Sequence, residues 1–300
     1  MAQGDVPILA SVGAALGYAR ENVRFVAIVS AIGAVAMTLV GALAMTAPML
    51  ALITMAASSL VQAFAYAALV GAALFGADAV RGRWTSDGGR VWAAMAIIGF
   101  FLFIVMFIVS IVVAIVLTAG PLGPYLGDLE RAGSDNAAVL AVFTRFAEEN
   151  ALTLLGVTLF YGAIWFLFTS RLYLAAPASI EQQRILSFET WSWTKGAMLR
   201  ITAARLMLLV PANIFAGALG HLVGRAFGVN SLDPASVAAA AAANPAGYLI
   251  YVLIAAFLTF ALYSSLEAVL STYLYRGLKP VEEQPAPQPD VLIGSPLRCG

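Results

Sequence analysis

The sequence predicts an all-α polytopic membrane protein: six transmembrane helices, interfacial amphipathic helices, and both termini in the cytoplasm. Three observations lead there. The 300 residues are 62% hydrophobic and only 11% charged, whereas about a quarter of the residues of a soluble domain are charged. A surface so poor in charge has to be covered by lipid. The apolar residues are gathered into long runs, and the basic residues are gathered into alternate connections between those runs.

Six of the apolar runs are long enough to cross a bilayer, which takes about 20 residues. The expected spans are residues 25–47, 49–77, 91–118, 152–175, 197–219 and 248–275. They make residues 1–276 a single membrane domain. From residue 277 the chain has five prolines and three acids and no apolar run, so residues 277–300 are predicted to be a disordered cytoplasmic tail.

Two segments outside the spans have the stripe of a surface helix. Residues 6–20 place Leu9 and Val12 on one face, and an acid at position 5 argues against a cleaved signal peptide. Residues 136–148 carry a similar apolar stripe behind Asp135, which is a favourable N-cap residue. Both helices are expected to lie along the membrane surface.

A third surface helix is expected over residues 180–194. Pro177 is expected to end the fourth span, because proline removes a backbone donor and clashes with the preceding turn. Ser179 is followed three residues later by Gln182, which is the spacing of a capping box. A new helix is therefore predicted to begin at Ile180, with tryptophans at headgroup depth.

The orientation follows from the bases, because cytoplasmic loops of membrane proteins are enriched in Lys and Arg. With the N-terminus inside, 13 of the 16 basic residues fall on the cytoplasmic side. A count of five or seven spans removes this asymmetry. The inside set is Arg20, Arg24, Arg81, Arg83, Arg90, Arg171, Arg184, Lys195, Arg200, Arg205, Arg276, Lys279 and Arg298, and the outside set is Arg131, Arg145 and Arg225.

Glu267 is the most informative polar residue, because it lies inside the sixth span. It precedes Arg276 by a helical rise of about 13 Å. An ionisable group at membrane depth costs at least ~2.5 kcal/mol, so it is usually paired or functional. One hypothesis is an ion pair with Arg205 or Arg171 that joins spans four, five and six. The other is a polar cavity in which Glu267 binds protons or a cation.

Further polar residues fit either a site or an ordinary structural role. Gln62 in the second span could line a pathway near Glu267 and Arg205, with Glu181 at its cytoplasmic side; such residues more often form interhelical hydrogen bonds. A basic group on the cytoplasmic side could hold anionic lipid headgroups, at about 1 kcal/mol per base. The positive-inside bias alone produces the same group, which consists of Arg184, Lys195 and Arg200.

Signals for catalysis, metal or cofactor are absent from the sequence. There is no HExxH, no GxSxG and no P-loop. The chain has one histidine, His221, and one cysteine, Cys299, which excludes a multi-histidine site and an internal disulfide. We therefore expect no enzyme, no cofactor and no metal. The net charge of +0 gives no indication of nucleic acid.

Three segments, RLYLAAPASIEQ, SFETWSWTKGAMLRI and YLYRGLK, resemble the six-helix membrane domain of some bacterial glycerophosphodiester phosphodiesterases and its stand-alone relatives. The resemblance runs from the first helix to Arg276. It implies a bacterial inner (plasma) membrane protein with this architecture. No segment resembles the soluble phosphodiesterase domain, so that activity is not expected. The matching positions are Arg171, Pro177, Glu181, Ser192, Thr194, Lys195, Gly196, Tyr275 and Arg276.

Three hypotheses for function follow. The first is a non-enzymatic membrane module that organises partners or envelope lipids. The second is a transporter or channel for a small or lipid-like solute, with a polar pathway near Glu267; the absence of an evident internal repeat weakens it. The third is an intramembrane enzyme, for which no residue constellation exists. The expected partners are membrane lipids and, as further candidates, other membrane proteins or a second copy.

Overall fold

The computed structural model describes residues 7–279, and no strand occurs in this range. It contains six helical segments that are long and apolar enough to cross a membrane. The six predicted spans are therefore confirmed as helices.

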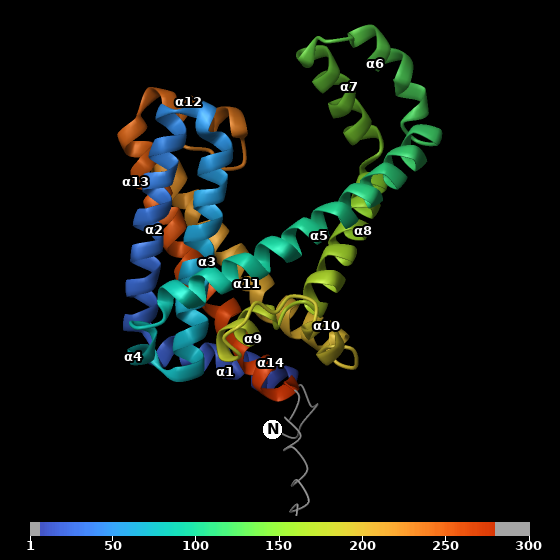
Figure 1. Cartoon of the computed structure of the whole chain (residues 1–300). Coiled ribbons are helices and arrows are strands. Elements are labelled where there is room, and N and C mark those ends of the chain that lie inside the picture. The colour runs from blue at the N-terminus through green and yellow to red at the C-terminus, as the bar shows by residue number, and fades with distance from the viewer. Residues whose placement is uncertain (1–6, 280–300) are drawn as a thin grey trace, which may run out of the picture.

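The first part of the structure is a bundle (Figure 1). It contains α2 (Val23–Thr46), α3 (Ala51–Phe75), α11 (Met198–Ala226) and α13 (Pro245–Leu258), with α12 (Pro234–Ala243) across one end. A short 3-10 turn, η1 (Pro48–Leu50), joins α2 to α3. The sixth span continues from α13 through a π-helical turn, η3 (Thr259–Ser264), into α14 (Ser265–Leu278).

The second part is an arm that leaves the bundle. It is formed by α5 (Trp84–Ala119) and α8 (Ala151–Arg171), and Figure 1 shows their far ends well away from α2 and α13. Large apolar side chains on the arm, including Phe100, Phe103 and Leu159, are more than 60% exposed. Such a surface is suited to contact with lipid.

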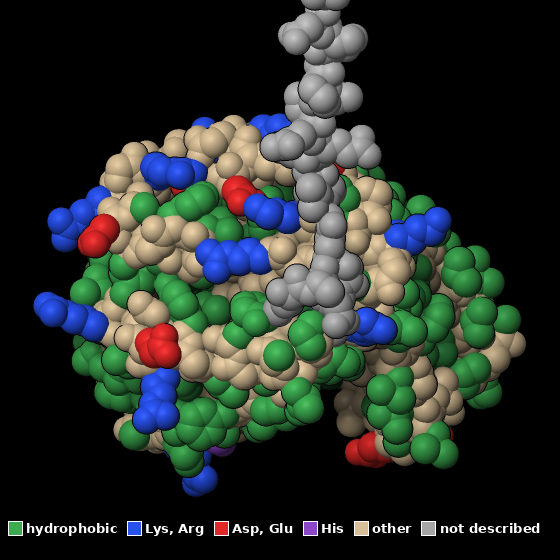
Figure 2. Space-filling model, turned by 90° about the horizontal axis from the view of Figure 1, so that it is seen from below, with side chains coloured by type: hydrophobic (Ala, Val, Ile, Leu, Met, Phe, Trp, Pro, Cys, Tyr) green, Lys and Arg blue, Asp and Glu red, His purple; other side chains and the backbone are tan. Residues whose placement is uncertain are grey.

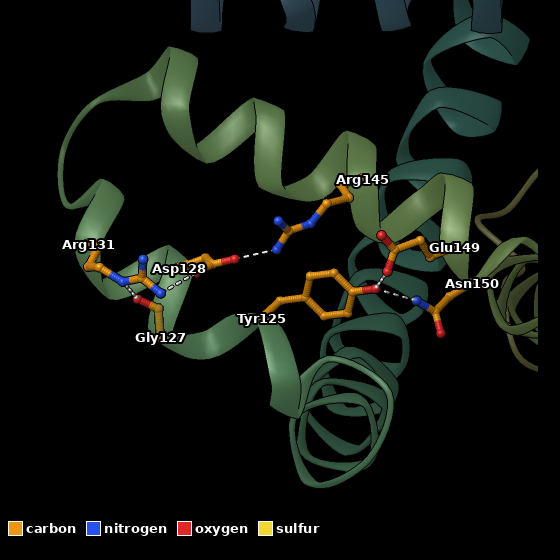
Figure 3. Close-up of polar contacts among 7 residues, drawn as sticks. All are labelled: Tyr125, Gly127, Asp128, Arg131, Arg145, Glu149 and Asn150. Carbon is orange, nitrogen blue, oxygen red and sulfur yellow. Dashed lines mark hydrogen bonds and ion pairs between the residues drawn. The ribbon is translucent and has the colours of Figure 1, made fainter.

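A small helical cap closes the far end of the arm. It consists of η2 (Gly123–Tyr125), α6 (Leu126–Ala132) and α7 (Asn136–Glu149). The Tyr125 hydroxyl donates to Glu149 and accepts from Asn150 Nδ2 at 3.2 Å, and Asp128 binds Arg145 (Figure 3). The predicted helix at 136–148 is thus present, and Asp135 caps it by accepting from two backbone N–H groups.

The opposite end of the molecule holds α1 (Ile8–Glu21), α4 (Ala77–Val80), α9 (Ala175–Glu181), α10 (Thr190–Trp193) and the end of α14. We call it the basal end; it lies at the bottom of Figure 1. Viewed from that side, Lys and Arg side chains are spread across the face (Figure 2). The predicted helix near residues 6–20 is present as α1.

Several predicted boundaries need correction. The helix of the third span begins at Trp84, ahead of the predicted start of the span at residue 91. The expected start of the tail was also wrong, because Gly277 and Leu278 are buried residues of α14. The rest of the predicted tail, 280–300, lies outside the described residues.

The predicted surface helix at 180–194 is wrong. Ile180 is the buried penultimate residue of α9, and the chain between α9 and α10 is formed of turns and bends. Two features explain why no helix continues from Ile180 to residue 194. Gln183 has φ 58°, a left-handed conformation that interrupts a helix. Ser179 does not cap a helix; its hydroxyl bonds the backbone of Leu186 instead.

Candidate functional site

The basal end is assembled around one stretch of chain, residues 170–181, which we call the hub segment. All of its residues are buried except Arg171 and Glu181, which are half-buried. The segment turns out of α8 and then forms α9, whose sequence AAPASIE is rich in small side chains. Small residues permit the close approach of neighbouring helices, so the hub segment fits between the bundle and the arm.

The hub segment contributes to three separate apolar clusters. Leu174 and Ala178 pack with residues of α1, α11 and α14. Ile180 packs with residues of α2, α3 and α5. Leu172 packs against α5. Because this one short segment has residues in all three clusters, it links the bundle to the arm, beside the direct packing of α3 on α5.

Two residues of the hub segment explain its local shape. Pro177 was expected to break the helix, but it is the third residue of α9, within the first turn, where a missing N–H leaves no intrahelical bond unmade. The Ser179 hydroxyl accepts from the Leu186 N–H at 2.9 Å and donates to the Leu186 carbonyl at 3.1 Å. This pair of bonds closes the chain that follows α9 back onto the hub.

Arg205 of α11 is the buried charge of the site, with 6% of its surface exposed. Its Nη1 donates to the hydroxyls of Thr169 and Ser170 at 2.9 Å each. Its guanidinium carbon lies 4.5 Å from the centre of the Tyr173 ring, within range of a cation–π interaction. Its Nε has no hydrogen-bond partner among residues 7–279. Arg205 therefore joins α11 to the end of α8 and to the hub segment.

Glu267 lies in the first turn of α14, and the charge of Arg205 acts on it. However, within residues 7–279 its carboxylate forms no ion pair with Arg205, Arg171 or any other base. The bond at this position is made by the backbone: the Tyr173 hydroxyl donates to the Glu267 carbonyl at 3.1 Å. The direct ion pair expected from the sequence is thus not formed in this structure.

The other residues of the predicted cluster are dispersed. Arg171 stacks over Trp191, with 4.7 Å between the guanidinium carbon and the ring centre. Glu181 forms an ion pair with Lys279 at 2.7 Å, which ties the hub segment to the end of α14. Gln62 is exposed on α3 and makes no hydrogen bond with another residue of the described range.

The three predicted headgroup ligands are all exposed, and all lie in the connection after α9 or at the start of α11. Arg184 donates through Nε to Gln182 at 3.2 Å. Lys195 follows α10, and Arg200 lies in the first turn of α11. Their exposure is compatible with lipid headgroups, and that role stays a prediction.

Sequence reasoning missed the hydroxyl groups that complete the site. Tyr66 of α3 shares a hydrogen bond of 2.9 Å with Ser271 of α14, and Thr202 donates to Ser170 at 2.9 Å. The one sequence feature that could have indicated these bonds is the pair of adjacent hydroxyl residues, Thr169 and Ser170, next to Arg171. Hydroxyls are common in membrane helices and usually bond their own backbone, so their long-range partners could not be read from spacing.

The polar groups of the site link neighbouring helices to the hub segment. Their donors and acceptors are mostly engaged with each other, and no group of three metal-ligating side chains occurs among residues 7–279. Comparison with protein families, curated proteins and solved structures finds no match. The resemblance to the phosphodiesterase-linked membrane domain therefore stays a prediction.

Proposed function

We propose that this chain is a multi-pass protein of the bacterial inner membrane that acts without catalysis, as a module organising partner proteins or envelope lipids. In this proposal the basal face is cytoplasmic. The support is the Lys and Arg side chains spread over that face (Figure 2), since positive charge favours the cytoplasmic side.

The hub segment is the observation that carries the proposal. It is buried, it joins the three apolar clusters, and it is held by Arg205, by the Ser179–Leu186 bonds and by the Glu181–Lys279 ion pair. A joint of this kind holds the arm at a fixed angle to the bundle. A fixed arm with exposed apolar faces is suited to positioning lipid or protein neighbours.

A second candidate function, proton- or cation-coupled transport, is favoured by Glu267. Its carboxylate lies in a predicted span without an ion pair to a described residue, and Arg205 and three tyrosines are its electrostatic neighbours: Tyr66, Tyr173 and Tyr263. An ionisable group at membrane depth often marks an ion path.

Flux measurement separates the two candidates. The protein is reconstituted in liposomes with a pH-sensitive dye inside, and a pH step is imposed with and without Na⁺ or K⁺. The module predicts no flux above that of empty liposomes. Flux that is present in the wild type, absent in Glu267→Gln and retained in Glu148→Gln, an exposed carboxylate of α7, would overturn the module in favour of transport.

A photocrosslinker tests the module directly. The crosslinker is placed at Phe188, which is 43% exposed in the connection between α9 and α10. It is expected to yield discrete adducts with a partner, and the same adducts when the chain also carries Glu267→Gln. A crosslinker at Phe100 on the arm is the matched control for bulk lipid. If Phe188 gives only bulk lipid adducts like those of Phe100, the proposed organising role has no basis.

A further inference from the structure

A groove of about 830 Å³ opens between α2 and α3, on the part of both helices nearest the basal end. This volume lies within the range of small-molecule sites, about 300–1,000 Å³. One face of α2, from Phe25 to Ala36, forms one wall, and residues 60–68 of α3 form the other. The lining is almost entirely apolar until the groove reaches α4.

The length of the groove matches one leaflet of a bilayer. From Phe25 to Ala36 an α-helix rises about 16 Å at 1.5 Å per residue. Half of a hydrocarbon core of about 30 Å is about 15 Å. The groove thus has room along its walls for an acyl chain of one leaflet, with the charged mouth at the level of the headgroups.

The mouth carries one acid and one base. Asp78 of α4 and Arg81 directly after α4 both line the groove, and both are exposed. Neither has an ion pair or hydrogen bond with another residue of the described chain. Trp84, 49% exposed, lies beside them at the start of α5; tryptophan is favoured at the membrane–water interface.

We propose that this groove binds one phospholipid whose headgroup carries both a phosphate and an ammonium. Arg81 donates to the phosphate, which guanidinium groups recognise well. Asp78 accepts from the ammonium. The acyl chains lie along the apolar walls below.

The presence of both Asp78 and Arg81, together with the length of the groove, favours this ligand over an anionic lipid or a transmembrane helix. A purely anionic headgroup would meet Arg81 but would be repelled by Asp78. A transmembrane helix of another protein would need an apolar face across both leaflets, whereas the groove spans about one. The groove is lined by no residue of the hub segment and by none of Arg184, Lys195 and Arg200. Its mouth lies at the basal end, so the proposal rests on the membrane location proposed above, whereas its test is independent of the flux and crosslinking measurements.

Native mass spectrometry of the full chain, released from detergent after exchange into defined lipids, tests the proposal. With equimolar phosphatidylethanolamine and phosphatidylglycerol, we expect a one-to-one adduct with phosphatidylethanolamine as the main species. Arg81→Gln should weaken binding of both lipids by about fivefold, the effect expected for one base near a membrane surface. Asp78→Asn should lower the preference for phosphatidylethanolamine without abolishing binding.

A blocking variant and two controls complete the test. Ala36→Phe fills the groove and should remove the adduct, whereas Ala163→Phe on the exposed face of α8 should not. Arg184→Gln is the matched control for loss of a basal charge and should leave the preference unchanged. Equal or stronger binding of phosphatidylglycerol by the wild type overturns the proposal, as does an adduct that persists in Ala36→Phe. If Ala36→Phe fails to fold, the two surface variants at the mouth still decide the matter.

Discussion

Replacing Arg205 by methionine tests whether the hub is held by this buried charge. The variant loses two hydrogen bonds from a charged donor, worth about 1.5–3 kcal/mol each, and the cation–π contact with Tyr173, worth about 1–2 kcal/mol. Part of this loss in stability is recovered, because burying the unpartnered Nε of the wild type costs about 1–3 kcal/mol and the methionine has no such group. The methionine also fills the space of the arginine stem.

The size of the expected loss in unfolding free energy depends on whether the Thr169 and Ser170 hydroxyls keep other hydrogen bonds. Thr169 still donates to the Trp165 carbonyl, and Ser170 still accepts from Thr202, so neither is left without a partner. We therefore expect Arg205→Met to lower the free energy of unfolding by about 3 kcal/mol, the sum of two charge-assisted hydrogen bonds at the lower end of their range. Arg205→Lys, which keeps the charge but not the planar fork, should cost less.

The assay is reversible unfolding in mixed micelles of mild detergent and SDS, followed by far-UV circular dichroism. Arg225→Met is the matched control, because Arg225 is an exposed base near the other end of the same helix. Its expected change is within about 0.5 kcal/mol. If Arg205→Met is as mild as this control, Arg205 does not hold the hub. A large loss in both variants would point to the helix in general.

The remaining predictions concern packing, the loop after α9 and the cap of the arm. A Cβ added at Gly88 would lie 2.7 Å from the ring of an α3 phenylalanine, so Gly88→Ala should cost about 1–3 kcal/mol; Gly89→Ala, with nothing within 4 Å, is the control, and equal melting temperatures would contradict the packing. Ser179→Ala leaves a buried backbone N–H without its acceptor and should cost about 1–3 kcal/mol; unchanged protease resistance of residues 182–189 would argue against this. The hydrogen bond from Arg145 lowers the pKa of Asp128, so Asp128 stabilises the cap above its unfolded pKa of about 3.9, and this contribution is lost as the pH falls through the lowered pKa. The distance between spin labels on α6 and α7 should increase on acidification of the wild type. In Asp128→Asn this distance should not change with pH.

Much of the fold could be predicted because it depends on local properties of the chain. The length of an apolar run decides whether a helix can span a bilayer, so the six helices long and apolar enough to do so were found from hydropathy. The N-cap of α7 was found for a similar reason, since Asp135 bonds N–H groups only two and three residues away. Asymmetry of charge is likewise a property of the sequence.

The site could be predicted only in part. Arg205 and Glu267 stood out because a charge in an apolar run is conspicuous. Their partners did not, because Tyr173 and Ser170 reach them across helices and share no spacing with them in the chain. The hypothesis of an ion pair required the Glu267 carboxylate and the Arg205 or Arg171 guanidinium to lie within bonding distance, and the sequence contains no distances between helices.

The sequence by itself determined that the chain forms six helices long and apolar enough to cross a membrane, because hydrophobic length and cap chemistry act within a few residues. The tertiary structure alone decided that residues 170–181 are buried. Their small side chains suit a tight joint, but the same composition also suits an ordinary span end. The groove between α2 and α3 was decided in the same way, since its walls and its charged mouth meet only when the helices pack and α4 folds against them.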